Sequence, residues 1–270
     1  TTEYSQLYAP AQPASARFGC SISMDDSTMI VGAYTESSKG AAYIFGYDKV
    51  DGIWYQANCQ RIAASDGATG DNFGCSVAVC GDYAVVGAYK GNIGTTAGVE
   101  SGSVYAYQCD SFKVWSEKKE ITPADGTADD MFGRSVCING NYVLTGAPGK
   151  DNGAGYIYGK GGSWASIQKI TPMSSAADDF FGGGVYTDGT YMICGDVNDD
   201  DFGINSGSAY VFEYTELGTL VLLAPNGGEN LPGGSAYDVT WSSTGPIDYV
   251  TLDYSVDNGS TWTAIGTAAD

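Results

Sequence analysis

The sequence predicts an all-β fold, and three observations support this prediction. Short runs rich in Val, Ile, Tyr and Phe recur along the 270 residues. Turn-forming residues separate these runs, and 39 of the residues are Gly, which is typical of strands joined by tight turns. The same motifs also return at intervals of about 50 residues, which is the spacing of repeat proteins built from small sheets.

The repeat unit has four expected strands. Each unit opens on a Phe-Gly pair, at Phe18, Phe73, Phe132 and Phe181. Two-residue turns are expected after the first strands, at Asp25-Asp26, Gly81-Asp82, Asn139-Gly140 and Asp188-Gly189. In the second unit, residues 83–88 form the second strand. Residues 102–107 and 115–121 are the expected third and fourth strands. Only the first three units contain a Trp-led fourth strand of this kind.

Four short antiparallel strands per unit predict a β-propeller of four blades over residues 1–217. Strand alternation would bury every second side chain against the neighbouring blade. The Gly that follows each Phe would let the inner strands approach closely.

The two ends of the repeat suggest how the propeller closes. Residues 6–10 match residues 168–172, which include the end of the fourth strand of the third unit, while the fourth unit lacks such a strand. We therefore expect residues 3–9 to pair with residues 209–212 and to remove an open edge. Two rival interpretations are that the chain is a piece of a longer array and that residues 219–224 supply the missing strand.

The motifs Phe-Gly-x-Ser-Val, Val-Gly-Ala, Ser-Gly-Ser-x-Tyr and Trp-x-x-x-Gln-Lys-Ile resemble the FG-GAP repeats of integrin α-subunit propellers. The bacterial-type variant, with a short hairpin after the first strand, is the most similar. The resemblance implies an extracellular or cell-surface location and adhesion or ligand binding on one face. The calcium loop that integrin-like blades carry after the first strand is replaced by a tight turn, as at Gly81-Asp82. The resemblance therefore does not imply the family's calcium sites.

Residues 218–270 have a different character. Pro225-Asn-Gly-Gly-Glu229, Trp241 and Tyr254-Ser-x-Asp-Asn-Gly-x-x-Trp262 resemble an immunoglobulin-like module of microbial surface proteins, related to the Ser/Thr-rich GPI-anchored cell-wall family. Asn258-Gly259 is a strong hairpin signal. We expect a partial immunoglobulin-like β-sandwich, apparently incomplete at Asp270, that a strand from another chain would complete.

Charge and composition disfavour several functions. The chain has 12 Lys and Arg against 32 Asp and Glu, a net charge of −20, so nucleic acid is not an expected partner. No run approaches the roughly 20 apolar residues of a membrane helix, so direct membrane insertion is not expected. The sequence has no His and no Cys-x-x-Cys pair among its seven Cys. These features exclude His-based catalysis and disfavour zinc-ribbon chemistry, and we expect no enzyme.

Two candidate binding features lie after the second strands. Asp196, Asn198 and Asp200 place oxygen ligands at alternate positions, which suits Ca²⁺. The alternative is a solvated acidic loop. Tyr34 and Tyr89 follow the Gly-Ala pairs of the first two units and are candidates for the ligand-binding face, although they would serve equally to pack against the next blade.

A carboxylate stands two residues before three of the Phe-Gly pairs, at Asp71, Asp130 and Asp179. Asp at this place most simply accepts backbone N–H groups in the turn between blades. A ring of cation sites is the alternative interpretation.

The sequence thus predicts an extracellular structural or adhesive surface protein, such as a self-assembling sheath or filament subunit that shares strands. Its expected partners are other copies of the chain or a cell-surface or matrix ligand. The alternative is a calcium-dependent propeller that binds a ligand or a glycan. A polysaccharide hydrolase or lyase is less favoured, because no convergent acid–base set is present.

Overall fold

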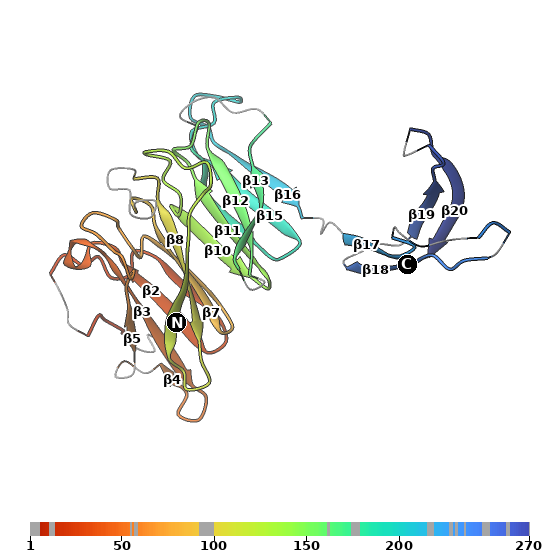
Figure 1. Cartoon of the computed structure of the whole chain (residues 1–270). Helices are drawn as coiled ribbons and strands as arrows, with labels where there is room; N and C mark the ends of the chain where they lie inside the picture. The colour runs from red at the N-terminus through yellow and green to blue at the C-terminus, as the bar shows by residue number, and fades with distance from the viewer. Residues whose placement is uncertain are drawn as a thin grey trace. The chain divides into compact units, whose positions relative to one another are not determined.

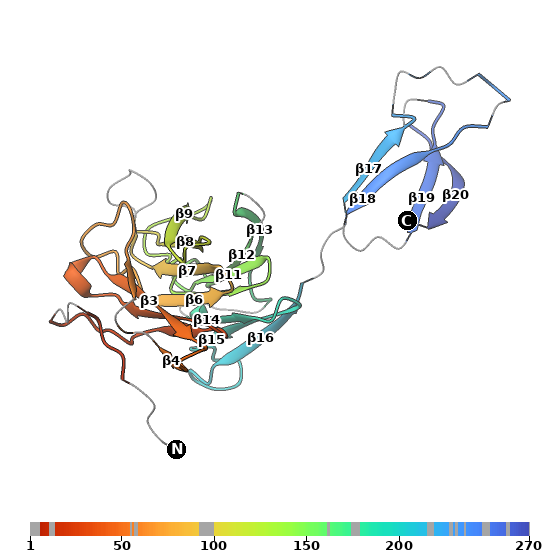
Figure 2. The ribbon, with the colours of Figure 1, turned by 90° about the horizontal axis from the view of Figure 1, so that it is seen from below.

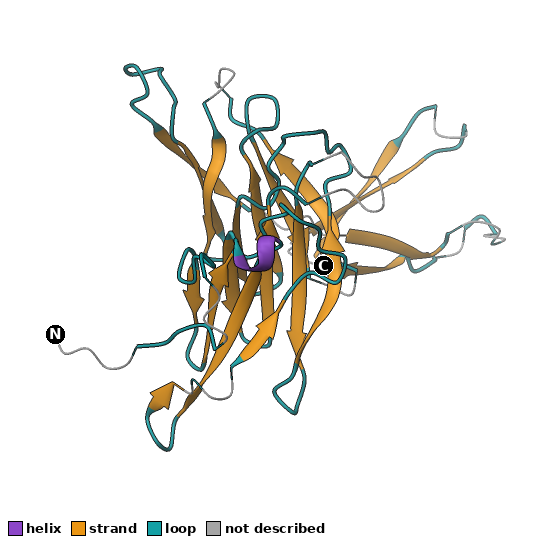
Figure 3. Cartoon of the chain, turned by 90° about the vertical axis from the view of Figure 1, so that its left-hand side faces the viewer, coloured by secondary structure: helices purple, strands orange, loops and turns teal. Residues whose placement is uncertain are grey.

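The computed structural model describes residues 6–10, 14–54, 56, 59–91, 100–160, 163–173, 179–214, 219–226, 229, 232–234, 236–244, 249–257 and 260–269. Apart from the short 3-10 segment η1 (Glu36–Ser38), the regular structure in these residues is all strand (Figure 3). No helix among them is long and apolar enough to cross a bilayer. The chain divides into two compact units, Thr1–Glu213 and Tyr214–Asp270, against an expected boundary at 217/218.

The first unit contains four antiparallel sheets in chain order (Figure 1). Sheet 1 has β1 (Ile22–Met24), β2 (Thr28–Ala33), β3 (Ala41–Asp48), β4 (Ile53–Trp54) and β5 (Gln60–Ile62). Sheet 2 has β6 (Ser76–Cys80), β7 (Tyr83–Ala88), β8 (Ser103–Cys109) and β9 (Trp115–Ile121). Sheet 3 has β10 (Ser135–Asn139), β11 (Tyr142–Ala147), β12 (Ala154–Gly159) and β13 (Ala165–Ile170). Sheet 4 has β14 (Phe181–Thr187), β15 (Tyr191–Asp196) and β16 (Ser208–Glu213), which lie side by side (Figure 2).

The expected strands of the repeat are present, and each of the four sheets has a two-residue turn after its first strand. Cys80 pairs with Tyr83, so sheet 2 has the predicted turn at residues 81–82. Asn139 pairs with Tyr142, and the N–H of Asp188 bonds the carbonyl oxygen of Tyr191, so the turns of sheets 3 and 4 lie at residues 140–141 and 189–190, one residue later than predicted. In sheet 1 the turn centres on residues 26–27 and not on 25–26, because the N–H of Asp25 bonds the carbonyl oxygen of Thr28. The carboxylate of Asp25 also accepts the N–H of Thr28, which stabilises this two-residue turn.

Successive sheets pack against one another, and the core lies between them. β6 contacts β1 and β2, β10 contacts β6 and β7, and β14 contacts β10, β11 and β12. Between sheets 2 and 3, for example, Val85 and Ala106 lie in one buried cluster with Val136 and Ile138. Burial of these apolar faces is the main force that holds neighbouring sheets together.

The described part of the N-terminal segment lies against sheet 1. Ala9 and Ala16 belong to a buried cluster with Val31 and Tyr43. The side chain of Gln56 accepts the N–H of Tyr8 at 2.9 Å and donates to its carbonyl oxygen at 2.6 Å. Residues 6–9 are therefore not paired with sheet 4, and the prediction that they close its edge is wrong. Residues 3–5 of the expected strand lie outside the described residues.

The physical reason is that burial of Ala9 in the apolar cluster on sheet 1, together with the Gln56 hydrogen bonds to Tyr8, holds this segment. The alternative that residues 219–224 supply the missing strand of sheet 4 is also wrong, because these residues pair with β18.

The second unit contains two hairpin-like sheets. β17 (Thr219–Ala224) pairs with β18 (Thr240–Thr244), and β19 (Tyr249–Tyr254) pairs with β20 (Thr263–Ala269). The predicted turn residues Asn258 and Gly259 lie outside the described residues. Beside them, the carboxylate of Asp257 accepts the N–H of Thr261 at 2.8 Å and its hydroxyl at 2.7 Å.

Candidate functional site

The acidic segment after β15 separates its predicted calcium ligands. Asp196 is fully buried at the end of the strand, Asn198 is half-buried, and Asp200 is exposed. No group of three or more Cys, Asp or Glu in the described part of the chain is placed to hold a metal ion. A calcium site at these three residues, one of which is an Asn, therefore stays a prediction.

Asp199, which the sequence analysis did not single out, is the organising residue of this loop. Its carboxylate accepts the hydroxyl of Ser208 at 2.5 Å, the hydroxyl of Tyr210 at 3.2 Å and the N–H of Asp201 at 2.9 Å. These bonds tie the loop to β16.

Asp196 occupies a position that is a fully buried Ala in the other sheets: Ala33, Ala88 and Ala147. Both of its carboxylate oxygens are buried and have no hydrogen-bond partner among the described residues. Burial, together with the negative charges of Asp179 and Asp199, raises its pKa to about 6. A carboxylate in this state attracts a proton, a hydrogen-bond donor or a cation.

Tyr34 and Tyr89 are half-buried and follow β2 and β7. The guanidinium of Arg17 lies 5.1 Å from the ring centre of Tyr34, and that of Arg134 lies 5.6 Å from the ring centre of Tyr89. Arg134 belongs to sheet 3 and Tyr89 to sheet 2, so this contact joins two sheets. A role in ligand binding stays a prediction for both tyrosines.

Each interface between successive sheets contains the same steric contact. We call the Phe-Gly pair that opens a sheet its plug, and the two glycines of the preceding sheet the socket. In the first interface the plug is Phe73-Gly74, and the socket is Gly32 and Gly40. A Cβ atom on Gly32 would overlap the carbonyl oxygen of Gly74, and one on Gly40 would overlap that of Phe73. Only glycine fits at either socket position.

The next two interfaces repeat this contact. Their plugs are Phe132-Gly133 and Phe181-Gly182, and their sockets are Gly87 with Gly102 and Gly146 with Gly153. In all three interfaces a serine hydroxyl of the preceding sheet donates to the carbonyl oxygen of the plug glycine: Ser21 to Gly74 at 2.9 Å, Ser76 to Gly133 at 2.7 Å and Ser135 to Gly182 at 2.8 Å.

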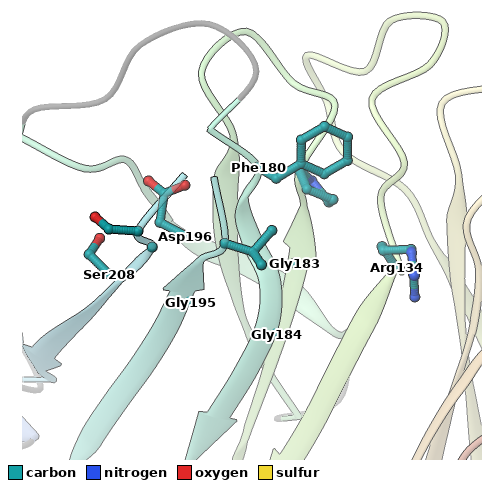
Figure 4. Close-up of a pocket in the computed structure, with 11 residues that line it drawn as sticks. Arg134, Phe180, Gly183, Gly184, Gly195, Asp196 and Ser208 are labelled. Carbon is teal, nitrogen blue, oxygen red and sulfur yellow. The ribbon is translucent and has the colours of Figure 1, made fainter. Parts of the chain in front are cut away.

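Among the described residues, no Phe-Gly pair occupies the socket of sheet 4. A Cβ atom on Gly195 would meet only the carbonyl oxygen of Gly184, at 3.7 Å, in this part of the chain, and the three atoms nearest to one on Gly207 are backbone atoms of Asp196 and Val197. Both glycines line a hollow of about 640 Å³. In Figure 4, Asp196 and Ser208 lie on one side of this hollow. At the place of the donor serine, sheet 4 has Gly184.

The face of sheet 4 that points away from sheet 3 is apolar and exposed to solvent. Tyr186, Ile193 and Val211 are 59%, 40% and 64% exposed. The residues at these positions in sheet 3, Cys137, Leu144 and Ile157, are buried against sheet 4 at 9%, 0% and 2% exposure. Sheet 4 therefore presents the same kind of face that every preceding sheet buries.

Sheet 1 presents the complementary free surface. Its plug, Phe18-Gly19, has no described atom within 4 Å of a Cβ built on the glycine. Ile22 and Met24 of β1 are 72% and 62% exposed. At the same positions sheet 2 has Val77 and Val79, both 6% exposed because sheet 1 covers them.

These contacts define a tandem-repeat β protein in which each sheet is built around one Phe-Gly pair. Four segments match the family model for the FG-GAP repeat: residues 1–45, 57–107, 115–158 and 164–212. The chain belongs to the FG-GAP repeat family. FG-GAP repeats are typical of extracellular proteins. A search of curated proteins gave no match.

Neither the free plug nor the open socket is predicted by the sequence patterns described above. Two signals in the fourth unit mark the socket: Gly184 stands where the other units have Ser, and Asp196 stands where they have Ala. Both departures were visible in the aligned motifs. Their meaning depends on knowing that these positions face the next sheet.

Proposed function

We propose that the protein is an extracellular structural or adhesive component that self-associates through the open ends of its sheet array. The observation that carries this proposal is the bare face and edge of sheet 4. Among the described residues β16 pairs only with β15, whereas β3, β8 and β12 have strand partners on both sides. An unpaired edge beside an apolar face is a template for another chain.

The energetic argument concerns the exposed side chains. Burying a large apolar side chain contributes roughly 1.5–3 kcal/mol, and Tyr186, Ile193 and Val211 are all available on one face. Association has to overcome lost rotational and translational freedom, so an interface of this kind needs the matching face as well. Sheet 1 offers such a face at Ile22 and Met24.

The remaining parts of the proposal follow from the family. We take the four sheets as blades of a propeller, and the second unit as an immunoglobulin-like spacer at the cell surface. The proposed partners are other copies of the chain or a cell-surface or matrix ligand. Nucleic acid is not a proposed partner of a chain with net charge −20.

Light scattering coupled to size-exclusion chromatography, together with electron micrographs, tests the proposal. We expect a mass that rises with concentration, and rings or filaments in the micrographs. A monomer at every accessible concentration would contradict self-association. Robust turnover of a glycan in hydrolase or lyase assays would contradict the non-catalytic role.

A second candidate function, calcium-dependent ligand binding, is favoured by the buried and unpartnered carboxylate of Asp196. Oxygen groups without partners suit a hard cation. Calorimetric titration with Ca²⁺ is expected to give heat with the wild type and none with Asp196→Ala. Absence of heat with the wild type would remove this candidate.

A further inference from the structure

We propose that the free plug of one chain, Phe18-Gly19, inserts into the open socket of a second copy, formed by Gly195 and Gly207, so that chains join head to tail. This inference rests on the proposed self-association and names the contact that produces it. Sheet 1 of one chain then follows sheet 4 of the next, as sheet 2 follows sheet 1 within a chain.

The plug already has the backbone conformation that insertion requires. The φ angle of Gly19 is +90°, close to the +89°, +84° and +89° of Gly74, Gly133 and Gly182, which are all inserted. The ring of Phe18 also has the orientation of the inserted rings. Its centre lies 5.6 Å from the ring centre of Tyr43 and 6.2 Å from that of Phe45, both in edge-on geometry. The inserted Phe73 ring lies 5.4 Å and 6.2 Å from its two edge-on neighbours. A pre-organised plug loses little conformational entropy on docking.

The socket is open in the corresponding places. The carbonyl oxygens that occupy the internal sockets come from plug residues such as Phe181 and Gly182, and no such group is near Gly195. The plug of sheet 1 does not occupy the socket of sheet 4 within the same chain. No backbone atom of either glycine, Gly19 or Gly195, lies within 4 Å of a Cβ atom built on the other. A second copy supplies both missing partners.

The apolar side chains correspond as well. Within the chain, Val136 and Ile138 of sheet 3 pack with Ala78, Val85 and Ala106 of sheet 2. The equivalent positions in the proposed contact are Ile22 and Met24 on one chain and Tyr186, Ile193 and Val211 on the other, all of them exposed. Docking would bury these side chains in the same arrangement.

The charges distinguish this contact from the internal ones. The residue before the plug is Asn72, Met131 or Phe180 in the internal interfaces, and it is Arg17 in the free plug. At the third interface, Phe180 before the plug and Pro148 of sheet 3 both line the 640 Å³ hollow described above. The equivalents of these two residues in the proposed contact are Arg17 of one chain and Val197 of the other. Arg17 would therefore lie beside Val197, next to the unpartnered carboxylate of Asp196.

The contact is heterologous, because it joins two different surfaces. Such contacts build rings when the rotation closes and open filaments when it does not. A two-fold dimer that joins sheet 4 to sheet 4 would leave both plugs free. This difference allows the two arrangements to be separated by mixing variants.

Gly195→Val tests the socket. The added side chain points into open space and the φ angle of Gly195 is not in the left-handed region, so the chain is expected to fold. We expect sedimentation velocity to show self-association weakened by about tenfold or more, as is typical when a central interface position is blocked. Gly46→Val is the matched control, because Gly46 is also a strand glycine with open space around it. It should associate as the wild type does.

Mixing tests the direction of the contact. Ile22→Asp places a charge on the plug face at an exposed position, and leaves the socket intact. Gly195→Val and Ile22→Asp are each expected to be monomeric alone and to form a one-to-one heterodimer when mixed. Failure of the mixture to associate would overturn the head-to-tail arrangement.

The charge pair is tested by combining Arg17→Asn with Asp196→Ala. Asn tolerates the left-handed φ of +54° at position 17. Arg17→Asn should weaken association by about threefold or more in the wild-type chain and by much less in the Asp196→Ala chain. Equal effects in both backgrounds would contradict the pairing.

The experiments also separate the plug contact from self-association in general. If the wild type associates and Gly195→Val changes nothing, the plug contact is wrong while self-association stands. If the wild type is monomeric, both proposals are wrong.

Discussion

At the scale of single residues, Asp196 is the side chain that the fold accommodates least easily. It replaces an alanine of the repeat, and its two carboxylate oxygens are buried with no hydrogen-bond partner in the part of the chain that the structure describes. Its pKa is raised to about 6 by burial and by the neighbouring carboxylates. Folding therefore favours the protonated form, and the ionised form destabilises the folded chain.

Asp196→Ala should increase stability at neutral pH. Because the folded pKa lies above the ordinary value of 3.8, the cost is absent below about pH 4, grows as the pH rises toward 6 and is complete above it. We expect the variant to be more stable than the wild type by roughly 1–3 kcal/mol at pH 7.

Urea unfolding at pH 4 and pH 7 checks this prediction. The difference between variant and wild type should shrink toward zero at pH 4. A difference that is the same at both pH values would show that Asp196 acts through packing and not through its charge. Asp253→Ala, at an exposed position of the second unit, is a suitable control.

The carboxylates before the plugs show how far residue patterns alone could be used. The prediction that they accept backbone N–H groups is confirmed for Asp71, which accepts the N–H of Ala68 at 2.5 Å, and for Asp130, which accepts that of Thr127 at 2.7 Å. This contact is local, so sequence spacing determines it. The burial of Asp196 depends on packing between elements and could not be derived in that way.

At the scale of elements, the glycine sockets determine how closely the sheets approach. A side chain in a filled socket must displace backbone, whereas one in the open socket displaces nothing. The repeat allows this comparison at two equivalent positions, the filled one at Gly146 in sheet 3 and the open one at Gly195 in sheet 4.

Gly146→Ala should destabilise the chain, because its Cβ atom would overlap the carbonyl oxygen of Gly182. We expect a loss of about 1–3 kcal/mol or more, which is the usual cost of overpacking. Gly195→Ala should change stability by no more than about 0.5 kcal/mol. Thermal unfolding of the two variants checks this, and equal losses would contradict the assignment of an open socket.

Strand positions were largely predictable, because alternation and turn residues are local signals. The edge to which an N-terminal strand would pair was not. Residues 6–10 match residues 168–172 in sequence, yet Ala9 packs in the buried cluster on sheet 1. Which strand edge is paired depends on the arrangement of whole sheets, and one-dimensional matching carries no information on that arrangement.

At the scale of the whole molecule, the first unit is an array of sheets with three filled interfaces and a free surface at each end. The second unit adds two small sheets, whose exposed apolar residues include Leu222, Leu223 and Ile265. The net charge of −20 opposes association of like chains. Self-association should therefore depend on ionic strength.

Raising the salt concentration from about 0.05 M to about 0.5 M should strengthen self-association, because the screening length falls well below 10 Å. Light scattering at fixed protein concentration measures the change in mass. Dissociation by salt would show that attractive ion pairs, and not the apolar faces, dominate the interface. The Arg17–Asp196 pair is expected to be a smaller contribution than the general repulsion.

The most direct test of head-to-tail association is sedimentation velocity of the wild type and Gly195→Val over a range of concentrations. The wild type should form concentration-dependent species larger than the 28.1 kDa chain, and Gly195→Val should remain a monomer at the same concentrations. A monomeric wild type, or a Gly195→Val variant that associates as the wild type does, would contradict the account.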